Sequence, residues 1–315
     1  MTARVFIDGE AGTTGLQIRK RLGDRKDISL LHIPDADRKD TSRRAEFLNM
    51  ADLVILCLPD DTARKSIDLI DNKNTRVIDA STAHRVASGW VYGFPEYDPK
   101  QRDAIARANR VSNPGCYAIA SISILHPLVS AGLITADWPI TINAVSGYSG
   151  GGKDLIAAFE DPNSDKYTSA PFYPYGLNLA HKHLAEITLW GGLKHIPTFV
   201  PSVGRYAQGM IVQIPLPLWS IPKKPRPADI HAILSEHYAG QKFVTIAPME
   251  ESCLMQNLEP EILNGTNDLH LYVFANEKNG LAVVMGLLDN LGKGASGQAV
   301  QNMNIMLDLP EDTGL

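Results

Sequence analysis

Gly9-Glu10-Ala11-Gly12-Thr13-Thr14-Gly15 carries the clearest signal of fold in the sequence. It follows Arg4–Asp8, which has the apolar character of a short buried strand, and precedes a helical pattern of Leu16, Ile18 and Leu22. In a strand–turn–helix unit, small residues let backbone N–H groups approach a pyrophosphate at the helix N-terminus. The Gly-x-x-Gly-x-x-Gly spacing differs from the commoner Gly-x-Gly-x-x-Gly, so a tight turn without a ligand is the alternative.

Apolar strands and helices alternate through the first third of the chain. Ile28–Ile33, Asp52–Leu58 and Arg76–Asp79 have the composition of strands, and Thr62–Ile70 that of a connecting helix. The near-continuous apolar run of the second of these strands is typical of a central parallel strand covered on both faces. Cys57 lies inside that run and is therefore predicted to be structural. The alternation, which continues to about residue 112, predicts an α/β fold with a doubly wound parallel sheet.

Acidic and basic residues both follow the second strand. In such units an acidic residue at this point binds the ribose hydroxyl of NAD, and a basic residue accommodates the 2′-phosphate of NADP. Arg38, Lys39, Arg43 and Arg44 favour NADP, with Arg38 as the predicted contact. A solvated run of charges is the alternative. Ser81 comes just after a strand, at the sheet edge where parallel sheets bind ligands.

Asn113-Pro114-Gly115-Cys116 is the candidate for chemistry. The Asn-Pro pair disfavours helix before it, and the glycine permits a sharp turn into the apolar helical run Tyr117–Leu133. The cysteine is then expected at a helix N-terminus, where unpaired N–H groups and the helix dipole stabilise a nucleophilic thiolate. The alternative is a buried cysteine that packs as a small apolar residue.

Two histidines lie in the stretch Asn178–Ile187. If Asn178 caps a helix, His183, Ile187 and Trp190 fall on one apolar face and His183 points inwards. A histidine on such a face is more often a core residue than a catalyst. His181 and His183 are separated by two positions, whereas two ligands of one metal on a helix are expected four apart, so no metal site is predicted.

Two further stretches have the residues of a ligand site. Arg205 lies in a loop rich in small residues, and its planar fork suits a carboxylate or a phosphate, although an exposed arginine is the alternative. Asp289–Gly297 ends the last strand and opens the last predicted helix, Gln298–Leu307. Gly292 and Gly294 permit close approach of the backbone to a ligand there. Leu269–Ala275 and Leu281–Leu288 are predicted to form a hairpin.

The composition narrows the class of protein. A chain of 315 residues, 44% hydrophobic and 21% charged, is typical of a globular protein of two domains. Its net charge of −5 favours neither nucleic acid nor an anionic membrane as a partner, and no apolar run is long enough to span a bilayer. The three cysteines are widely spaced, which predicts neither disulfides nor a zinc site. The chain start lacks a signal-peptide core, so a cytoplasmic location is expected.

The sequence resembles the short form of N-acetyl-γ-glutamyl-phosphate reductase from arginine biosynthesis, a family related to aspartate-semialdehyde dehydrogenase. The resemblance covers essentially the whole chain. It is carried by the following motifs: Gly9–Gly15, Ser112–Tyr117, His181-Lys182-His183, Val203–Tyr206, and Asn290–Gly297 with Gln301–Asn304. It implies an NADP-binding domain over 1–115, an α+β domain for catalysis and subunit contact over 116–290, and a C-terminal helix over 291–315 that returns to the first domain.

The resemblance also implies an activity. Cys116 is implied as the nucleophile that forms a thioester, His183 as the base, and His181 and Arg205 as substrate-side residues. The implied reaction is the NADPH-dependent conversion of N-acetyl-glutamyl 5-phosphate to the semialdehyde and inorganic phosphate. The remaining expected contacts are Asn113 for the substrate and, for the cofactor NADP(H), Gly9, Gly12, Thr13, Thr14, Gly15, Arg38, Ser81, Gly292 and Gly294.

Two other functions are compatible with these motifs. One is an aspartate-semialdehyde dehydrogenase or another acyl-phosphate reductase, which would use the same cysteine chemistry on a different substrate. The other is a non-catalytic NADP-binding module, such as a redox sensor. The presence of a nucleophile, a candidate base and two glycine clusters in one chain favours an enzyme. The family further implies a homo-oligomer, either a dimer or a tetramer.

Overall fold

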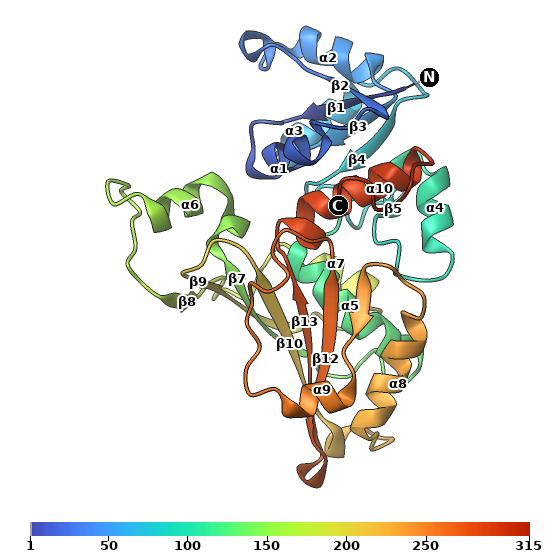
Figure 1. Cartoon of the computed structure of the whole chain (residues 1–315), viewed down its shortest axis with the longest axis vertical. Coiled ribbons are helices and arrows are strands. Elements are labelled where there is room, and N and C mark those ends of the chain that lie inside the picture. Colours follow the sequence, from blue (N-terminus) through green and yellow to red (C-terminus); the bar gives the residue numbers. More distant parts are fainter. Residues whose placement is uncertain (1) are drawn as a thin grey trace. The chain divides into compact units, whose positions relative to one another are not determined.

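The computed structural model describes residues 2–315, which divide into two compact units. The first unit ends at Gly115 and is completed by Ala295–Leu315, and the second comprises Cys116–Gly294. Figure 1 shows both units coloured along the chain.

The first unit is built on a six-stranded parallel sheet in the order β2-β1-β3-β4-β6-β5. Its strands are β1 (Ala3–Asp8), β2 (Ile28–Leu31), β3 (Leu53–Leu56), β4 (Arg76–Asp79), β5 (Val91–Tyr92) and β6 (Arg110–Ser112). Its helices are α1 (Thr13–Leu22), α2 (Thr41–Met50), α3 (Asp60–Asp68), α4 (Gln101–Arg107) and α10 (Gly297–Met306), with a short 3-10 turn, η1 (Asp35–Asp37).

Apolar cores lie on the two faces of this sheet. One contains side chains of α1, α4 and α10, including Ile18, Ile105 and Met303. The other contains side chains of α2 and α3, including Leu48 and Ala63. Because β3 contributes alternate residues to both cores, its four residues are all buried. The predicted doubly wound sheet is thereby confirmed.

The last helix belongs to the first unit although almost the whole second unit precedes it in the chain. All ten residues of α10 are buried, and it packs against α1, α4 and β4 (Figure 1). The chain reaches α10 through η5 (Gly292–Ser296), a π-helical turn that directly precedes the helix. The Arg76 guanidinium, at the start of β4, donates to the backbone carbonyl of Met306 at the helix end.

The second unit is built on a seven-stranded mixed sheet in the order β11-β12-β13-β10-β7-β9-β8. Its strands are β7 (Thr141–Gly147), β8 (Phe172–Pro174), β9 (Thr198–Gly204), β10 (Met210–Pro217), β11 (Val244–Ile246), β12 (Leu269–Asn276) and β13 (Leu281–Leu288). Its helices are α5 (Cys116–Ser130), α6 (Gly152–Glu160), α7 (Leu184–Trp190), α8 (Pro227–His237) and α9 (Met249–Leu254). Three 3-10 turns complete it: η2 (Tyr148–Gly151), η3 (Leu218–Ser220) and η4 (Glu277–Asn279).

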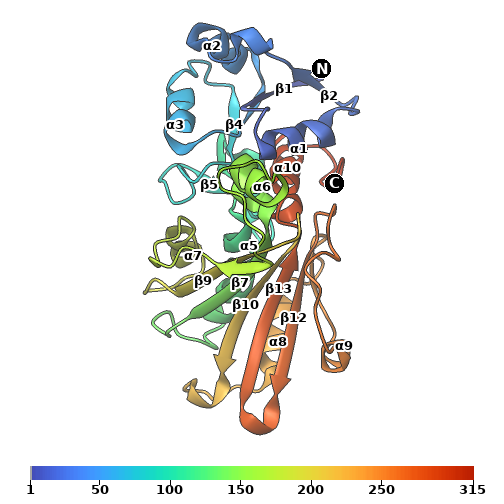
Figure 2. The ribbon, with the colours of Figure 1, turned by 90° about the vertical axis from the view of Figure 1, so that its left-hand side faces the viewer.

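Helices cover both faces of this second sheet. α5 packs against β10 and β13, and α8 packs against α5 and β12 (Figure 2). On the other side α9 lies against β12, where Ile211, Tyr272 and Leu287 form a separate apolar cluster. The predicted hairpin is confirmed: β12 and β13 are antiparallel, and they are joined by η4 and Gly280, whose φ of +63° suits glycine.

Candidate active site

Cys116 is the first residue of α5, which confirms its predicted place at a helix N-terminus. The connection from β6 to this helix consists of Asn113, Pro114 and Gly115, all of them buried. The cysteine itself is partly exposed. A thiol in this position gains the electrostatic stabilisation that a helix N-terminus gives to an anion, and it is open to a reactant.

Cys57 has the opposite environment. It follows β3 directly, and burial, together with the nearby carboxylates of Asp79 and Asp8, raises the pKa of its thiol far above the ordinary value. Such a thiol stays protonated and unreactive. The prediction that Cys57 is structural therefore agrees with its surroundings.

The two histidines do not lie on a helix, contrary to the expectation for the segment after Asn178. α7 begins only at Leu184, immediately after His183. Gly176 and Leu179 both have left-handed backbone, with φ of +63° and +55°, and a right-handed helix cannot pass through such residues. The backbone N–H of His183 instead donates to Nδ1 of His181, 3.2 Å away.

The inward position of His183 is nevertheless correct. Its side chain is buried, and its ring lies 5.9 Å from that of Tyr117 and 4.8 Å from that of His181. His181 in turn contacts Tyr117, Tyr175 and Phe199 edge-on. Both histidines are thus packed around the aromatic side chain that directly follows Cys116.

Two tyrosine hydroxyls, for which the sequence predicted no role, interact electrostatically with the cysteine. Tyr175 donates to the hydroxyl of Tyr117 across 3.1 Å, and Tyr117 donates to the carbonyl of Ser202 across 3.3 Å. Burial raises the pKa of Tyr175 to about 12, and the negative charge of the Cys116 thiolate adds to this effect. Burial likewise raises the pKa of Tyr117, with smaller contributions from Tyr175 and Cys116. Both hydroxyls therefore remain neutral hydrogen-bond donors near neutral pH.

Asn113, which was expected to contact substrate, has its polar groups engaged inside the first unit. Its backbone N–H donates to the carbonyl of Asp79, and its side-chain Nδ2 donates to the carbonyl of Ala295, 3.0 Å away. Its Oδ1 accepts from Nδ2 of Asn302. Its own carbonyl accepts from Nε of Arg85. These contacts fix the turn that leads to Cys116.

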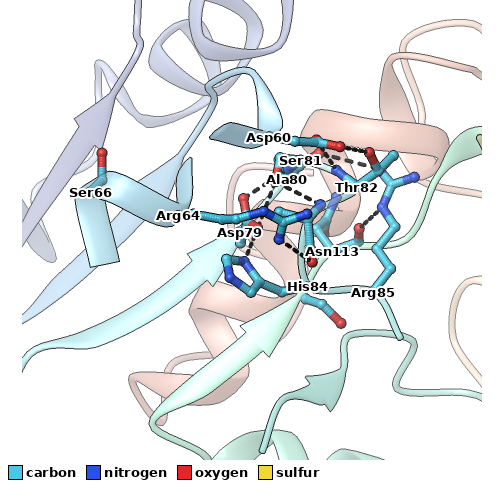
Figure 3. A network of polar contacts seen from close by, with 12 residues as sticks. Asp60, Arg64, Ser66, Asp79, Ala80, Ser81, Thr82, His84, Arg85 and Asn113 are labelled. Carbon is cyan, nitrogen blue, oxygen red and sulfur yellow. Dashed lines mark hydrogen bonds and ion pairs between the residues drawn. The ribbon is translucent and has the colours of Figure 1, made fainter. Parts of the chain in front are cut away.

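A polar loop follows β4 and contains Ser81 (Figure 3). The buried carboxylate of Asp79 accepts from the Ser81 hydroxyl at 2.7 Å and contacts Nδ1 of His84 at 2.6 Å. The His84 ring stacks on Trp90 with centroids 4.1 Å apart. Thr82 donates to the carboxylate of Asp60 at the start of α3 through both its backbone N–H and its hydroxyl. The loop therefore has a defined shape at the carboxyl edge of the sheet, where the sequence placed a cofactor contact.

Arg205 is engaged with backbone carbonyls. Its Nη1 donates to Phe159 at 3.0 Å, its Nε to Ala170 at 3.2 Å, and its Nη2 to Thr168. The guanidinium also lies over the Phe159 ring, 5.0 Å from the centroid. These contacts tie the segment after α6 to the end of β9. A role in binding substrate stays a prediction.

The glycines of η5 have close neighbours within the second unit. A Cβ on Gly292 would overlap the carbonyl oxygen of Thr266, and one on Gly294 would lie 2.7 Å from Cβ of Cys116. Gly294 thus allows the backbone to pass directly over the cysteine. This contact accounts for the glycine without a cofactor, so its cofactor role also stays a prediction.

The loop Gly9–Gly15 joins β1 to α1 as a tight turn. Gly9 has φ of +92°, and a Cβ on it would overlap the carbonyl oxygen of Cys57, while a Cβ on Gly15 would overlap that of Gly9. Gly12 is the N-cap of α1 and supplies no side-chain hydrogen bond to the helix, which begins with Thr13 and Thr14 and has no acidic residue in its first turn. The first N–H groups are thus available to an anion, so the loop fits a pyrophosphate.

Other kinds of site are absent from the described part of the chain. Among residues 2–315, no three His, Cys, Asp or Glu side chains gather in a way that could hold a metal ion. Within the same residues, no helix has both the length and the apolar character needed to cross a bilayer.

Comparison with known proteins matches both units to one family. The NAD binding domain of semialdehyde dehydrogenases matches residues 4–105, and the semialdehyde dehydrogenase dimerisation domain matches residues 116–290. The chain belongs to the semialdehyde dehydrogenase family. Members of this family are phosphorylating oxidoreductases, and the NAD binding domain indicates a nicotinamide cofactor.

Relatives within the semialdehyde dehydrogenase family include N-acetyl-gamma-glutamyl-phosphate reductases. That of Chelativorans sp. (strain BNC1) is 54% identical over 98% of this chain and 99% of its own. That of Brucella ovis is 52% identical over 98% and 99%. N-acetyl-gamma-glutamyl-phosphate reductase 2 of Nostoc sp. (strain PCC 7120) is 49% identical over 99% of both chains. The resemblance given by the sequence motifs is confirmed.

Solved structures in the family share the fold at low sequence identity. Aspartate semialdehyde dehydrogenase II from Vibrio cholerae, complexed with ASA, has a TM-score of 0.71 at 12% identity over 98% of this chain and 99% of its own. Aspartate semialdehyde dehydrogenase with NADP from Candida albicans has a TM-score of 0.66 at 13% identity, over 98% and 99%. The predicted fold class, a Rossmann-type domain plus an α+β domain, is therefore confirmed.

Proposed function

We propose that this protein is an NADPH-dependent N-acetyl-γ-glutamyl-phosphate reductase, which converts N-acetyl-L-glutamyl 5-phosphate to N-acetyl-L-glutamate 5-semialdehyde and inorganic phosphate in arginine biosynthesis. The observation that carries the proposal is the partly exposed Cys116 at the N-terminus of α5. The choice of substrate rests on relatives about half identical over nearly the whole chain. Aspartate-semialdehyde dehydrogenases share only the fold at this level of identity.

Cys116 acts as the nucleophile. Its thiolate attacks the acyl carbon of the substrate, a carbon–sulfur bond forms, and the carbon–oxygen bond to phosphate breaks, which leaves a thioester and inorganic phosphate. The backbone N–H groups at the start of α5 are suited to hold the oxyanion that develops during attack. NADPH, when bound, supplies the hydride that reduces the thioester carbon. The carbon–sulfur bond then breaks, and the sulfur returns to the thiolate.

His183 is the proposed acid–base group. An imidazole titrates in the range that lets it accept the thiol proton and return a proton at the later step. Its support is its burial beside Tyr117, the residue next to the nucleophile. His181 is the proposed substrate-side residue, because it is the more exposed of the two and touches the same aromatic cluster. The neutral hydroxyl of Tyr175, which donates to Tyr117, adds a polar group that the sequence alone did not suggest.

The proposed cofactor is NADP(H), held by the loop Gly9–Gly15 and by Arg38. The uncapped N-terminus of α1 suits the pyrophosphate, and the guanidinium suits a 2′-phosphate. Ser81 remains a proposed contact at the edge of the sheet. We further propose a homo-oligomer, a dimer or a tetramer, on the strength of the match to a dimerisation domain, and a cytoplasmic location.

The experiment follows the near-ultraviolet absorbance of NADPH in the reverse direction, with N-acetyl-glutamate semialdehyde, phosphate and NADP⁺. NADPH should form only when the acetylated substrate and phosphate are both present, and Cys116→Ser should abolish turnover while circular dichroism shows an intact fold. Turnover with aspartate semialdehyde instead would retain the cysteine chemistry and contradict the substrate. NADPH binding without turnover on either aldehyde would indicate a redox sensor.

A further inference from the structure

Glu10 is a buried carboxylate surrounded by basic side chains. Only 4% of the residue is exposed, although it lies between two glycines of a surface turn. Its Oε1 is 2.9 Å from Nδ1 of His32, 3.4 Å from Nη1 of Arg19 and 3.8 Å from Nη2 of Arg38. We call these four residues the Glu10 cluster.

The four residues converge from separate elements. Glu10 follows β1, His32 follows β2 directly, Arg19 lies on α1, and Arg38 follows η1. β1 and β2 are adjacent and parallel, so the cluster forms at their shared carboxyl edge. In doubly wound folds this is where the ribose of the adenosine half of a dinucleotide is bound and its 2′ position is distinguished.

The cluster combines opposite chemistries in one place. A 2′-phosphate carries a charge of about −1.5 to −2, so basic side chains attract it and a carboxylate repels it. A ribose hydroxyl, by contrast, is favoured by a carboxylate acceptor. Because Glu10 is buried beside His32 and Arg19, its carboxylate faces these side chains and not solvent.

The Arg38 guanidinium has a hydrogen-bond donor that no residue of the described chain engages in this arrangement. It is ion-paired to Asp35 and lies within ion-pair distance of Glu10, yet a third of its side chain is exposed. Its Nε is buried without a hydrogen-bond partner among residues 2–315. A guanidinium with an unused donor suits an additional oxyanion, since the fork can bind two anions at once.

We propose that Glu10 determines the cofactor specificity of this site, by competing with the 2′-phosphate of NADP for Arg38 and its basic neighbours. The inference rests on the proposed use of a nicotinamide dinucleotide. The Glu10 carboxylate makes the cluster bind a 2′-phosphate less strongly than its three basic side chains alone would. The preference for NADP over NAD is therefore smaller than it would be without Glu10. In this role Glu10 takes no part in the chemistry at Cys116 and changes only the relative affinities for the two dinucleotides.

The test measures the dissociation constants of NADP⁺ and NAD⁺ by calorimetry for the full chain and three variants. Glu10→Gln keeps the size and a hydrogen-bond acceptor but removes the charge, and should tighten the binding of NADP⁺ by about tenfold while leaving that of NAD⁺ unchanged, the effect of removing a nearby like charge. Arg38→Gln should lower the preference by a similar factor. Asp103→Asn is the control, because it removes a carboxylate that pairs with Arg107 on α4, a helix that contributes no residue to the Glu10 cluster. It should leave the ratio unchanged.

The outcomes separate this inference from the proposed function. If wild type binds and turns over but Glu10→Gln leaves the ratio unchanged, or weakens NAD⁺ selectively, the inference is wrong and the proposed function stands. The second of these results would mean that Glu10 accepts from the ribose hydroxyl. If Glu10→Gln does not fold, Arg38→Gln decides, since an unchanged ratio there contradicts a basic site for the phosphate. If wild type binds neither dinucleotide, both proposals are wrong.

Discussion

Asn302 on α10 donates from its side-chain Nδ2 to Oδ1 of Asn113, 3.1 Å away, and the same nitrogen donates to the carbonyl of Gly93 at 2.9 Å. Both asparagines are buried. The last helix of the chain therefore holds the side chain of a residue that lies three positions before the proposed nucleophile. A Cβ on Gly93 would overlap Nδ2 of Asn302, so the approach depends on glycine at that position.

Asn302→Ala should reduce turnover through Cys116 as well as stability. It removes the donor to Oδ1 of Asn113 and to the Gly93 carbonyl, at a cost of about 1–3 kcal/mol. Asn304→Ala is the matched control, because Asn304 is an equally buried asparagine of α10 whose side chain bonds Arg25 and the carbonyls of Glu311 and Thr313, away from the turn before Cys116. Thermal unfolding should show a loss in both variants, and kcat should fall only in the first. An equal fall in kcat would contradict the positioning role.

Gly294→Ala should abolish most of the activity. The new methyl group would lie 2.7 Å from Cβ of Cys116, so either the helix start or the π-helical turn must move. A displacement of about 1 Å at a nucleophile can cost on the order of 100-fold in rate. Gly23→Ala provides the comparison, because Gly23 has ordinary helical φ and ψ at the end of α1. Steady-state kinetics on both variants check this, and full activity of Gly294→Ala would show that the turn adapts without cost.

Tyr175→Phe should make the free energy of unfolding less dependent on pH under alkaline conditions. Burial raises the pKa of Tyr175 from 10.0 to about 12, so the folded state retains this proton where the unfolded state loses it. The unfolded state then binds fewer protons, and the free energy of unfolding declines as pH rises from about 10 to about 12. The variant lacks this contribution, so its decline should be shallower. Urea titrations across that range test it, with the exposed Tyr167 changed to Phe as the control. Parallel curves for wild type and Tyr175→Phe would refute the expectation.

Arg205→Lys should lower the stability of the segment after α6 and leave KM for the semialdehyde nearly unchanged. A lysine cannot reproduce three donors directed at the carbonyls of Phe159, Thr168 and Ala170, so the segment after α6 should loosen by about 1–2 kcal/mol. Limited proteolysis of that segment and KM for the semialdehyde are the two measurements. A large increase in KM with unchanged proteolysis would instead support the substrate contact predicted from the sequence.

The elements with a local signal were predictable. The strand–glycine–helix unit around Gly9, the apolar strand that ends just before Cys57, and the turn from Asn113 into α5 each combine propensity, pattern and turn residues that agree with one another. Their boundaries shift by a few residues, as β3 does when it ends at Leu56. Family membership follows from the same motifs.

The parts set by tertiary contacts were not predictable. The segment before His183 has a helical pattern, yet left-handed residues at Gly176 and Leu179 prevent a helix, and no residue type announces the second of these. The buried environment of Glu10 depends on side chains from three other elements, which no local pattern reveals. The hydrogen bond from Tyr175 to Tyr117 links positions 58 residues apart in the same way.

The assignment of α10 to the first unit has a consequence for synthesis of the chain. Five residues of α10 complete an apolar core whose other buried residues come from the first 111 positions: Ala299, Val300, Met303, Ile305 and Met306. During translation the parallel sheet is made first, but one of its faces is covered only by α1 and α4 until the ribosome has added the whole second unit and the last helix. Exposed apolar sheet surface promotes aggregation, and contacts of such sequence separation form slowly. We therefore expect nascent chains that end before residue 297 to require a chaperone, and the released full chain to fold its first unit last.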